Sequence, residues 1–287
     1  MPPCFFVSDL HGDVRRYQKL FAAIVRERPE AVFIGGDLLP LTWCLHQSAD
    51  FAAEDFIGGF LLKNFLHLQG ELRDAYPRAF LIMGNDDCRA EEPTVLAAAT
   101  QGVWQYIQNS RVIFRGFDVY GYSYVPPTPF RLKDWERYDV SRYVDPGAVS
   151  PEEGIRSVPV PDEEKKYATI QDDLERLTGR ADLSRAIFLF HSPPYKTNLD
   201  LSTLEPKMVD HVPIDPHLGS IAVRRFIETR QPLLTLHGHI HEAARVSHSW
   251  RDVIGRTFCF SAAHDGPELA LVRFDPEYLE SATRELI

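Results

Sequence analysis

Carboxylate, amide and imidazole side chains recur in this sequence directly after short apolar runs. The first pair is Asp9 and His11, which follow the apolar residues 5–7. Side chains alternate across a strand with a period of two, so these two groups should point the same way at the strand end. An oxygen ligand and a nitrogen ligand side by side can bind a metal ion, although a capping Asp followed by a surface His has the same spacing.

Five apolar runs end in this manner. The later ligand candidates are Asp37 after residues 31–34, Asn85 after 79–83, His191 after 186–190, and His239 and His241 after 233–236. Each one alone fits a structural role, such as a turn residue, a left-handed Asn or a buried histidine. Five unrelated structural roles would not explain why all of these positions hold carboxylate, amide or imidazole groups and none holds Lys or Arg. Open α/β sheets place their sites where the carboxyl ends of strands meet, so the set indicates one shared site.

The elements that must position these residues follow from hydrophobic periodicity. Short, fully apolar runs predict buried parallel strands, and spacings of three and four residues predict amphipathic helices. The helices are expected at residues 14–26, 50–76 and about 220–230, a hairpin at 112–114 and 119–124, and further strands at 257–261 and 269–274. The pattern predicts an α/β fold formed by one domain over residues 1–287.

The residue composition changes between about residue 125 and about residue 180, and the regular apolar spacing is lost there. Prolines recur, charged and aromatic residues dominate, and a helix is expected at about 163–178. Long irregular segments inside a compact domain are usually binding loops or lids. We therefore expect an insertion that covers the site as a lid.

Composition limits the function classes. The formal net charge is −10, which disfavours a general nucleic-acid or anionic-membrane binder, since such proteins normally carry a basic face. The four cysteines (Cys4, Cys44, Cys88 and Cys259) are scattered and are expected to be reduced thiols. With no basic leader and no apolar run of membrane length, the chain is expected to be cytoplasmic.

The five blocks together resemble the calcineurin-like metallophosphoesterases. The family's ordered pattern is Asp-x-His, Gly-Asp, Gly-Asn-His-Asp/Glu, His and Gly-His-x-His. The matching residues here are Asp9-Leu10-His11, Gly36-Asp37, Gly84-Asn85-Asp86-Asp87, His191 and Gly238-His239-Ile240-His241. The resemblance spans residues 5 to about 245 and leaves out the insertion. One block departs from the pattern, because Asp86 stands where the family usually has a histidine.

The resemblance implies a four-layer α/β/β/α sandwich of two mixed sheets and a dinuclear metal centre. Two divalent ions would be bound, and their identity (Mn, Fe, Zn or Ni) is left open by the mixture of oxygen and imidazole ligands. Carried over by position, the first ion's ligands would be Asp9, His11, Asp37 and His241. The second ion's ligands would be Asp37, Asn85, His191 and His239. A hydroxide shared by the two ions would be the nucleophile.

Asp86 and Asp87 are the candidate catalytic residues. The family's histidine at the first position is thought to act near the leaving group, which an ionised Asp cannot do. We expect Asp86 to be ionised and non-donating; the alternatives are a proton shared with Asp87, or an acid supplied by His264 or His46. His237, which precedes the last block, is expected to be a packing residue.

The implied activity is metal-dependent hydrolysis of a small phosphoester, with a phosphodiester ahead of a monoester. The alternative from another class is a non-catalytic metal-binding scaffold of the same fold, and a DNA nuclease is disfavoured by the acidic charge. Weaker signals are basic residues of the insertion that either contact a phosphate or form a solvated surface (Arg131, Lys133, Arg137 and Arg142) and two polar residues that could line the pocket (Asn198 and Asp200).

Overall fold

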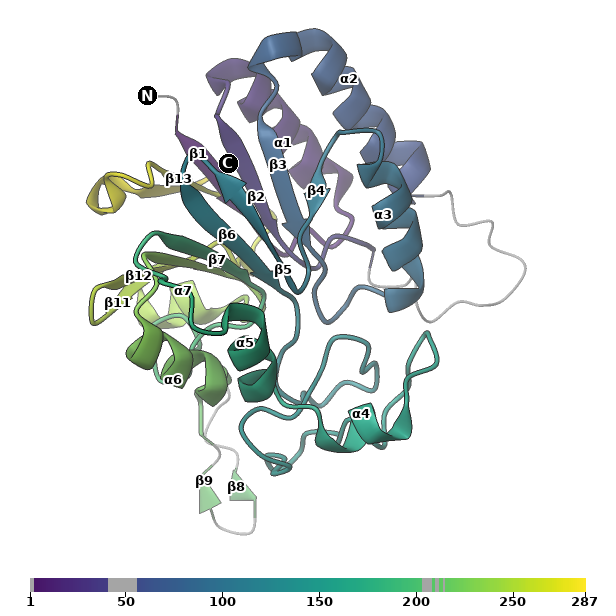
Figure 1. Cartoon of the computed structure of the whole chain (residues 1–287), viewed down its shortest axis with the longest axis vertical. Helices are drawn as coiled ribbons and strands as arrows, with labels where there is room; N and C mark the ends of the chain where they lie inside the picture. Colours follow the sequence, from purple (N-terminus) through teal and green to yellow (C-terminus); the bar gives the residue numbers. More distant parts are fainter. Residues whose placement is uncertain (1–2, 41–55, 203–207, 210–211, 214) are drawn as a thin grey trace.

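The computed structural model describes residues 3–40, 56–202, 208–209, 212–213 and 215–287. Within these residues the chain forms two six-stranded sheets and a short two-stranded ribbon of β8 (Met208–Val209) and β9 (Val212–Pro213). Figure 1 shows the two sheets face to face between helices.

The first sheet has the strand order β14-β13-β1-β2-β3-β4. Its strands are β1 (Cys4–Val7), β2 (Ala31–Gly35), β3 (Arg78–Ile82), β4 (Gln105–Tyr106), β13 (Ala270–Phe274) and β14 (Thr283–Leu286). The strands β1 to β4 are parallel, whereas β13 and β14 are antiparallel to their neighbours. The carboxyl ends of β1, β2 and β3 therefore meet at the same edge.

The second sheet has the order β11-β12-β10-β7-β6-β5. Its strands are β5 (Ser110–Phe114), β6 (Phe117–Tyr122), β7 (Ala186–Phe190), β10 (Leu234–His237), β11 (Arg251–Ile254) and β12 (Thr257–Ser261). The four central strands are parallel and the two edge strands are antiparallel. The expected hairpin at 112–114 and 119–124 is β5 and β6, and its turn contains Gly116 with a φ of +80°.

Alternate side chains of each strand serve two different cores, as the period of two requires. Phe6, Phe33 and Phe80 pack between the sheets with Leu189 and Phe260. A separate core lies under the helices. The helices of the first sheet are α1 (Val14–Glu27), the π-helix η1 (Phe56–Leu62), α2 (Lys63–Leu72) and α3 (Glu92–Ala99), and α5 (Ile170–Thr178) and α6 (Ile221–Arg230) flank the second (Figure 1). The predicted α/β/β/α sandwich of two mixed sheets is confirmed.

The insertion is well packed for a segment with so little regular structure. Trp135, Lys133 and Glu136 are each 1% exposed or less. The single helix expected at 163–178 is in fact two, α4 (Asp162–Tyr167) and α5, because Ala168 is extended and the Thr169 hydroxyl caps α5 by accepting the N–H of Asp172. The insertion's role as a lid stays a prediction.

Several smaller elements were not predicted from the sequence. They are the 3-10 helices η2 (Arg73–Ala75), η3 (Arg89–Glu91) and η4 (Leu279–Ser281), and α3, α7 (Ala243–Ser247), β4, β8, β9, β11 and β14. The first part of the helix expected at 50–76 lies outside the described residues. Among the described cysteines, Cys4 and Cys259 are free and buried, whereas Cys88 is disulfide-bonded, so the expectation of reduced thiols is wrong for that residue. No helix in the described ranges has the length and apolarity to cross a bilayer.

Candidate metal centre

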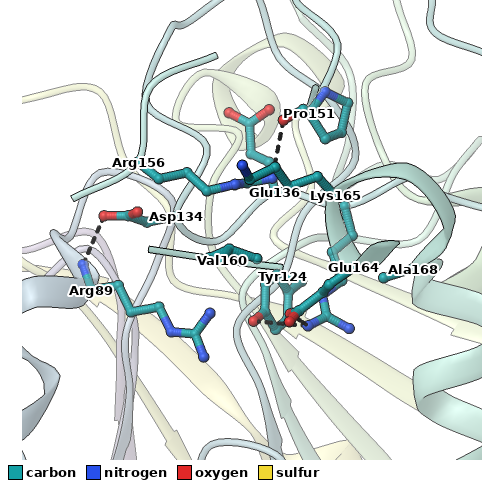
Figure 2. Close-up of a pocket in the computed structure, with 11 residues that line it drawn as sticks. Arg89, Tyr124, Asp134, Glu136, Pro151, Arg156, Val160, Glu164, Lys165 and Ala168 are labelled. Carbon is teal, nitrogen blue, oxygen red and sulfur yellow. Dashed lines mark hydrogen bonds and ion pairs between the residues drawn. The ribbon is translucent and has the colours of Figure 1, made fainter. Parts of the chain in front are cut away.

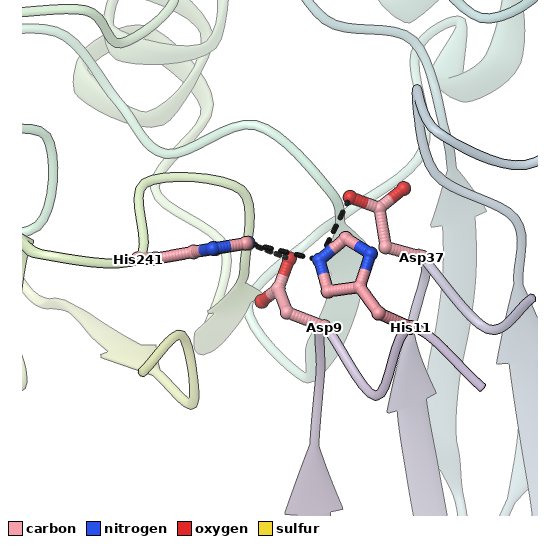
Figure 3. A group of neighbouring side chains, drawn as sticks. All are labelled: Asp9, His11, Asp37 and His241. Carbon is pink, nitrogen blue, oxygen red and sulfur yellow. Dashed lines mark hydrogen bonds and ion pairs between the residues drawn. The ribbon is translucent and has the colours of Figure 1, made fainter. Parts of the chain in front are cut away.

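The loops that follow β1, β2, β3, β7 and β10 bring the seven ligand candidates to one edge of the sandwich. The first group consists of Asp9, His11, Asp37 and His241, and one ligand atom from each lies within 4.8 Å of the others. Figure 3 shows these side chains converging from both sheets.

The distances in this group suit ligands of a single ion. The Nε2 atoms of His11 and His241 lie 3.1 Å apart, and His241 Nε2 lies 3.4 Å from Asp9 Oδ1. His11 Nε2 is 3.8 Å from Asp37 Oδ2. Two nitrogens that each bind one ion at about 2.0–2.1 Å are roughly 3 Å apart. The first group therefore has the spacing of a metal-binding site.

A second group forms around His191, which is fully buried. Its Nε2 lies 3.2 Å from Asp37 Oδ2 and 3.0 Å from Asn85 Oδ1. Its Nδ1–H donates to the carbonyl oxygen of Gly35 at 2.8 Å, which fixes the ring with Nε2 toward the group. The His239 ring lies 5.3 Å from the His191 ring, centroid to centroid. Asp37 thus lies between the two groups.

Four of these residues have a left-handed backbone. The φ angles of Asp9, His11, Asp37 and His239 are +57°, +45°, +51° and +73°. Non-glycine residues seldom adopt positive φ, and such strain costs about 1–3 kcal/mol for each residue. Backbone strain of this kind concentrates at functional sites, and here it aims the side chains inward.

The glycines beside the ligands permit close approach of the loops. A Cβ on Gly84 would lie 2.2 Å from Asp37 Oδ1 and 2.7 Å from a ring carbon of His191. A Cβ on Gly238 would lie 2.0 Å from the Ser8 hydroxyl and 2.7 Å from Asp9 Oδ2. The glycines of the Gly-Asn and Gly-His blocks are therefore required by the packing of the site itself.

The ionisation of the site reflects buried charges of opposite sign. Burial acts against a charged His191, but the Asp37 carboxylate outweighs it and raises the pKa of His191 to about 10. For His241, burial is likewise outweighed, here by Asp9, and the pKa rises to about 9. Burial acts to raise the pKa of Asp37, yet His191 and His11 lower it to about 2. In the absence of metal, the histidines provide the positive charge that the carboxylates require.

Asp86 and Asp87 occupy different environments. Asp86 is 26% exposed in its side chain, and its Oδ2 lies 3.8 Å from His11 Nδ1. Burial and then the Asp37 carboxylate raise the pKa of Asp86 to about 7. The Asp87 carboxylate is fully buried and accepts the backbone N–H groups of Leu38, Leu39 and Gly84. This placement favours a positioning role for Asp87 over the predicted catalytic one.

The remaining candidates have structural partners. His237 is buried, with hydrogen bonds to the Ser192 carbonyl and the Thr235 hydroxyl, as expected for a packing residue. His264 is paired with Glu268 at 3.0 Å, and His46 lies outside the described residues. The buried Asp200 carboxylate accepts the N–H groups of Lys196, Thr197 and Gly219, and Asn198 is exposed.

The basic residues of the insertion divide into two kinds. Lys133 is fully buried in an ion pair with Glu136, and Arg137 is paired with Asp173 and Glu164. Arg142 is an exposed partner of Glu152. Lys133 and Arg137 therefore neither belong to a solvated surface nor are available to contact a phosphate, because acidic residues of the insertion compensate their charges.

Sequence reasoning missed Arg16, on the first turn of α1. Its guanidinium donates to the carbonyl oxygens of Asp9 and Gly266, and so holds the first ligand loop. A helical arginine gives no signal of this role, because the contact depends on Gly266, which is distant in the sequence.

The residues fit a divalent ion at the first group. Asp9 Oδ2 is buried and has no hydrogen-bond partner among the described residues. Unpartnered buried polar atoms are rare in native structures and call for a missing partner. The donor set of this group, two carboxylates and two imidazoles, suits Mn, Fe, Zn or Ni.

We predict that Gly84→Ala will lower metal content sharply, because the added methyl group would displace Asp37 and His191. Elemental analysis and denaturant unfolding of the purified protein measure both effects. Gly70→Ala is the matched control, since nothing lies within 4 Å of its added Cβ on α2. Its stability should rise by up to ~1 kcal/mol, the difference in helix propensity. Full metal content in Gly84→Ala would show that the close approach is unnecessary.

The raised histidine pKa values predict proton release on metal binding. An unfolded histidine has a pKa near 6.5, so the stabilisation from protonated His191 and His241 is complete below about pH 6.5. It is lost in the metal-free protein as the pH rises through about 9 to 10. Metal binding requires neutral imidazoles, so affinity should increase with pH over this range. Calorimetric titration at pH 7 in buffers of different ionisation enthalpy measures the released protons, and a buffer-independent heat would contradict the prediction.

Comparison with solved structures agrees with the fold. The protein TT1561 of Thermus thermophilus is 17% identical, with a TM-score of 0.54 over 99% of this chain and 98% of that chain. A dimetal phosphatase from Danio rerio is 13% identical, with a TM-score of 0.52 over 95% of this chain and 92% of that one. At these identities the likeness shows the fold alone.

No curated protein matches the chain. The family model described as calcineurin-like phosphoesterase matches residues 2–243, which include all five sequence blocks and both groups of ligand candidates. The chain belongs to the calcineurin-like phosphoesterase family.

Proposed function

We propose that the protein is a phosphoester hydrolase that uses two divalent metal ions. The observation that carries this proposal is the position of Asp37, whose Oδ2 lies 3.8 Å from His11 Nε2 in the first group and 3.2 Å from His191 Nε2 in the second. One carboxylate between two sets of imidazole and oxygen donors suits a bridging ligand. The ions, when bound, would supply Lewis-acid stabilisation of negative charge on the phosphoryl group.

The ligands of each ion would be those implied by the resemblance. Asp9, His11, Asp37 and His241 would hold the first ion, and Asp37, Asn85, His191 and His239 the second. The chain supports these side chains through their backbones: the Asp86 N–H donates to Asp37 Oδ1, and the His239 N–H donates to Asp9 Oδ1. Such outer hydrogen bonds orient ligands before the metal arrives.

Asp86 would face the substrate beside the first ion, since its carboxylate is partly exposed and lies next to His11. Bound cations stabilise a nearby anion, so the carboxylate should be ionised in the loaded protein. A dianionic phosphomonoester would be repelled by this group more strongly than a monoanionic phosphodiester. We therefore propose a small phosphodiester as the preferred substrate, with the insertion limiting its size.

The leaving-group dependence of the rate tests this function. Loss of a general acid typically costs ~10²–10⁴-fold for leaving groups that need a proton, whereas activated aryl esters need it little. Rates of aryl and alkyl phosphodiesters should therefore fall steeply as the leaving-group pKa rises. Asp86→His should flatten this slope if the metal content is unchanged, and Asp86→Asn should leave the steep slope as it is.

Three outcomes separate the alternatives. A shallow slope in the unmodified protein that steepens in Asp86→Asn would make Asp86 itself the acid. A shallow slope in all three proteins would assign the acid to another residue. Two bound ions with no turnover of any activated phosphoester would contradict the hydrolase and favour the metal-binding scaffold.

A further inference from the structure

The segment 134–139 of the insertion connects the two loops that carry the proposed ligands of the second ion. One loop follows β3 in the first sheet and contains Asn85. The other follows β7 in the second sheet and contains His191. The segment contacts the first loop through Asp134 and a neighbour of the second loop through Asp139. The inference below rests on the proposed dinuclear site.

The Asp134 end holds the first loop. Asp134 is 1% exposed, and its Oδ2 accepts the backbone N–H of Arg89 at 2.9 Å (Figure 2). The Ser157 N–H donates to Oδ1, and the Ser157 hydroxyl accepts the N–H of Ala90. Two successive backbone groups just beyond the Gly-Asn-Asp-Asp block are thus bound by the insertion.

The Asp139 end holds the second loop through helix α6. The Asp139 carboxylate accepts the N–H groups of Ile221 and Ala222 and the Ser220 hydroxyl, so it caps α6 from outside. Ser220 in turn pairs with the His191 loop, since its N–H donates to the Pro193 carbonyl and its carbonyl accepts the Tyr195 N–H. The residue that Asp139 holds is therefore also hydrogen-bonded to the ligand loop.

The chain between the two ends is fixed. The Trp135 carbonyl oxygen accepts the N–H of Val125, and the Arg137 N–H donates to the Val125 carbonyl oxygen, as between two neighbouring strands. Arg137 is held by the Asp173 carboxylate, which also accepts the Tyr122 hydroxyl of β6. Tyr122 belongs to the same edge of the second sheet, because its carbonyl accepts the N–H of His191. The middle of the segment is thereby attached to the sheet next to the ligand.

Residues 134–139 are long enough to connect the two sheets. Five residue steps of extended chain span at most about 17 Å. This length is enough to reach from one sheet to the other, because stacked sheets are ~10 Å apart. We propose that residues 134–139 form a fixed brace that sets the separation between the Asn85 loop and the His191 loop. Asp134 and Asp139 are its positioning residues, and neither touches the ions or the substrate.

The magnetic coupling between two Mn²⁺ ions bound to the protein can be measured, and a variant that is merely less stable should not change it. Two neighbouring Mn²⁺ ions give an exchange-coupled electron paramagnetic resonance spectrum. Asp134→Ala and Asp139→Ala should weaken binding of the second ion about 10–100-fold, the usual effect of losing an outer-shell partner, and should remove the coupling. Asp139→Asn should restore both only in part, because its single amide oxygen can replace the acceptor of Ser220 and Ala222 or that of Ile221, but not both.

A second measurement needs no metal. In the metal-free protein, hydrogen exchange should accelerate in residues 84–91 for Asp134→Ala and in residues 191–195 for Asp139→Ala. Thr257→Ala is the control, since it removes the hydrogen bond of a fully buried hydroxyl to the Pro232 carbonyl at the start of β12 and touches neither the insertion nor either ligand loop. It should lower the melting temperature comparably and leave the coupling and the exchange of both loops unchanged.

The outcomes distinguish the brace from the function on which it rests. Two bound, coupled ions in the unmodified protein together with unchanged coupling in both Ala variants would overturn the brace alone. Equal loss of coupling in Thr257→Ala would also overturn it, because general destabilisation would then suffice. An unmodified protein that binds no second ion would overturn the proposed function and the brace together.

Discussion

The buried carboxylate of Asp37 is the constraint on which the site depends. It is 1% exposed, its backbone has a positive φ, and its two oxygens serve different neighbours: Oδ1 accepts the Asp86 N–H, and Oδ2 faces His11 and His191. Gly84 is required because any side chain there would occupy the same space. The loops after β2, β3 and β7 are thus arranged around one functional group.

The sandwich makes this concentration of charge tolerable. An isolated buried carboxylate costs several kcal/mol unless opposite charge is close, and here the protonated His191 and His241 of the second sheet provide it. Both sheets place the carboxyl ends of their parallel strands at one edge, so positive and negative groups arrive together. Divalent ions bound at the same point would take over this compensation. Binding of such ions would release the protons that His191 and His241 hold.

The sequence predicted the features that depend on short-range pattern. Apolar runs ended within one residue of the ends of β1, β2, β3, β7 and β10, and the polar residues that follow them converge as expected. Features that depend on distant partners were missed. Arg16 is the example, because its partner Gly266 is 250 residues away. Lys133 was missed for another reason: its partners Glu136 and Thr128 are close in the sequence, but they enclose it only in the folded insertion, whose irregular backbone the pattern does not predict. The break at Ala168 was hidden because the apolar spacing continues across it, while the Thr169 cap gives only a local signal.

Metal content of Asp37→Asn tests the central claim most directly. An amide is neutral and a weaker ligand, so removal of a bridging carboxylate should weaken both sites at once. Asn85→Ala should mainly weaken the second, because the Asn85 Oδ1 atom lies against His191 in the second group. Elemental analysis after exhaustive dialysis should find two ions in the unmodified protein, one in Asn85→Ala, and one or none in Asp37→Asn. Two tightly held ions in Asp37→Asn would contradict the account.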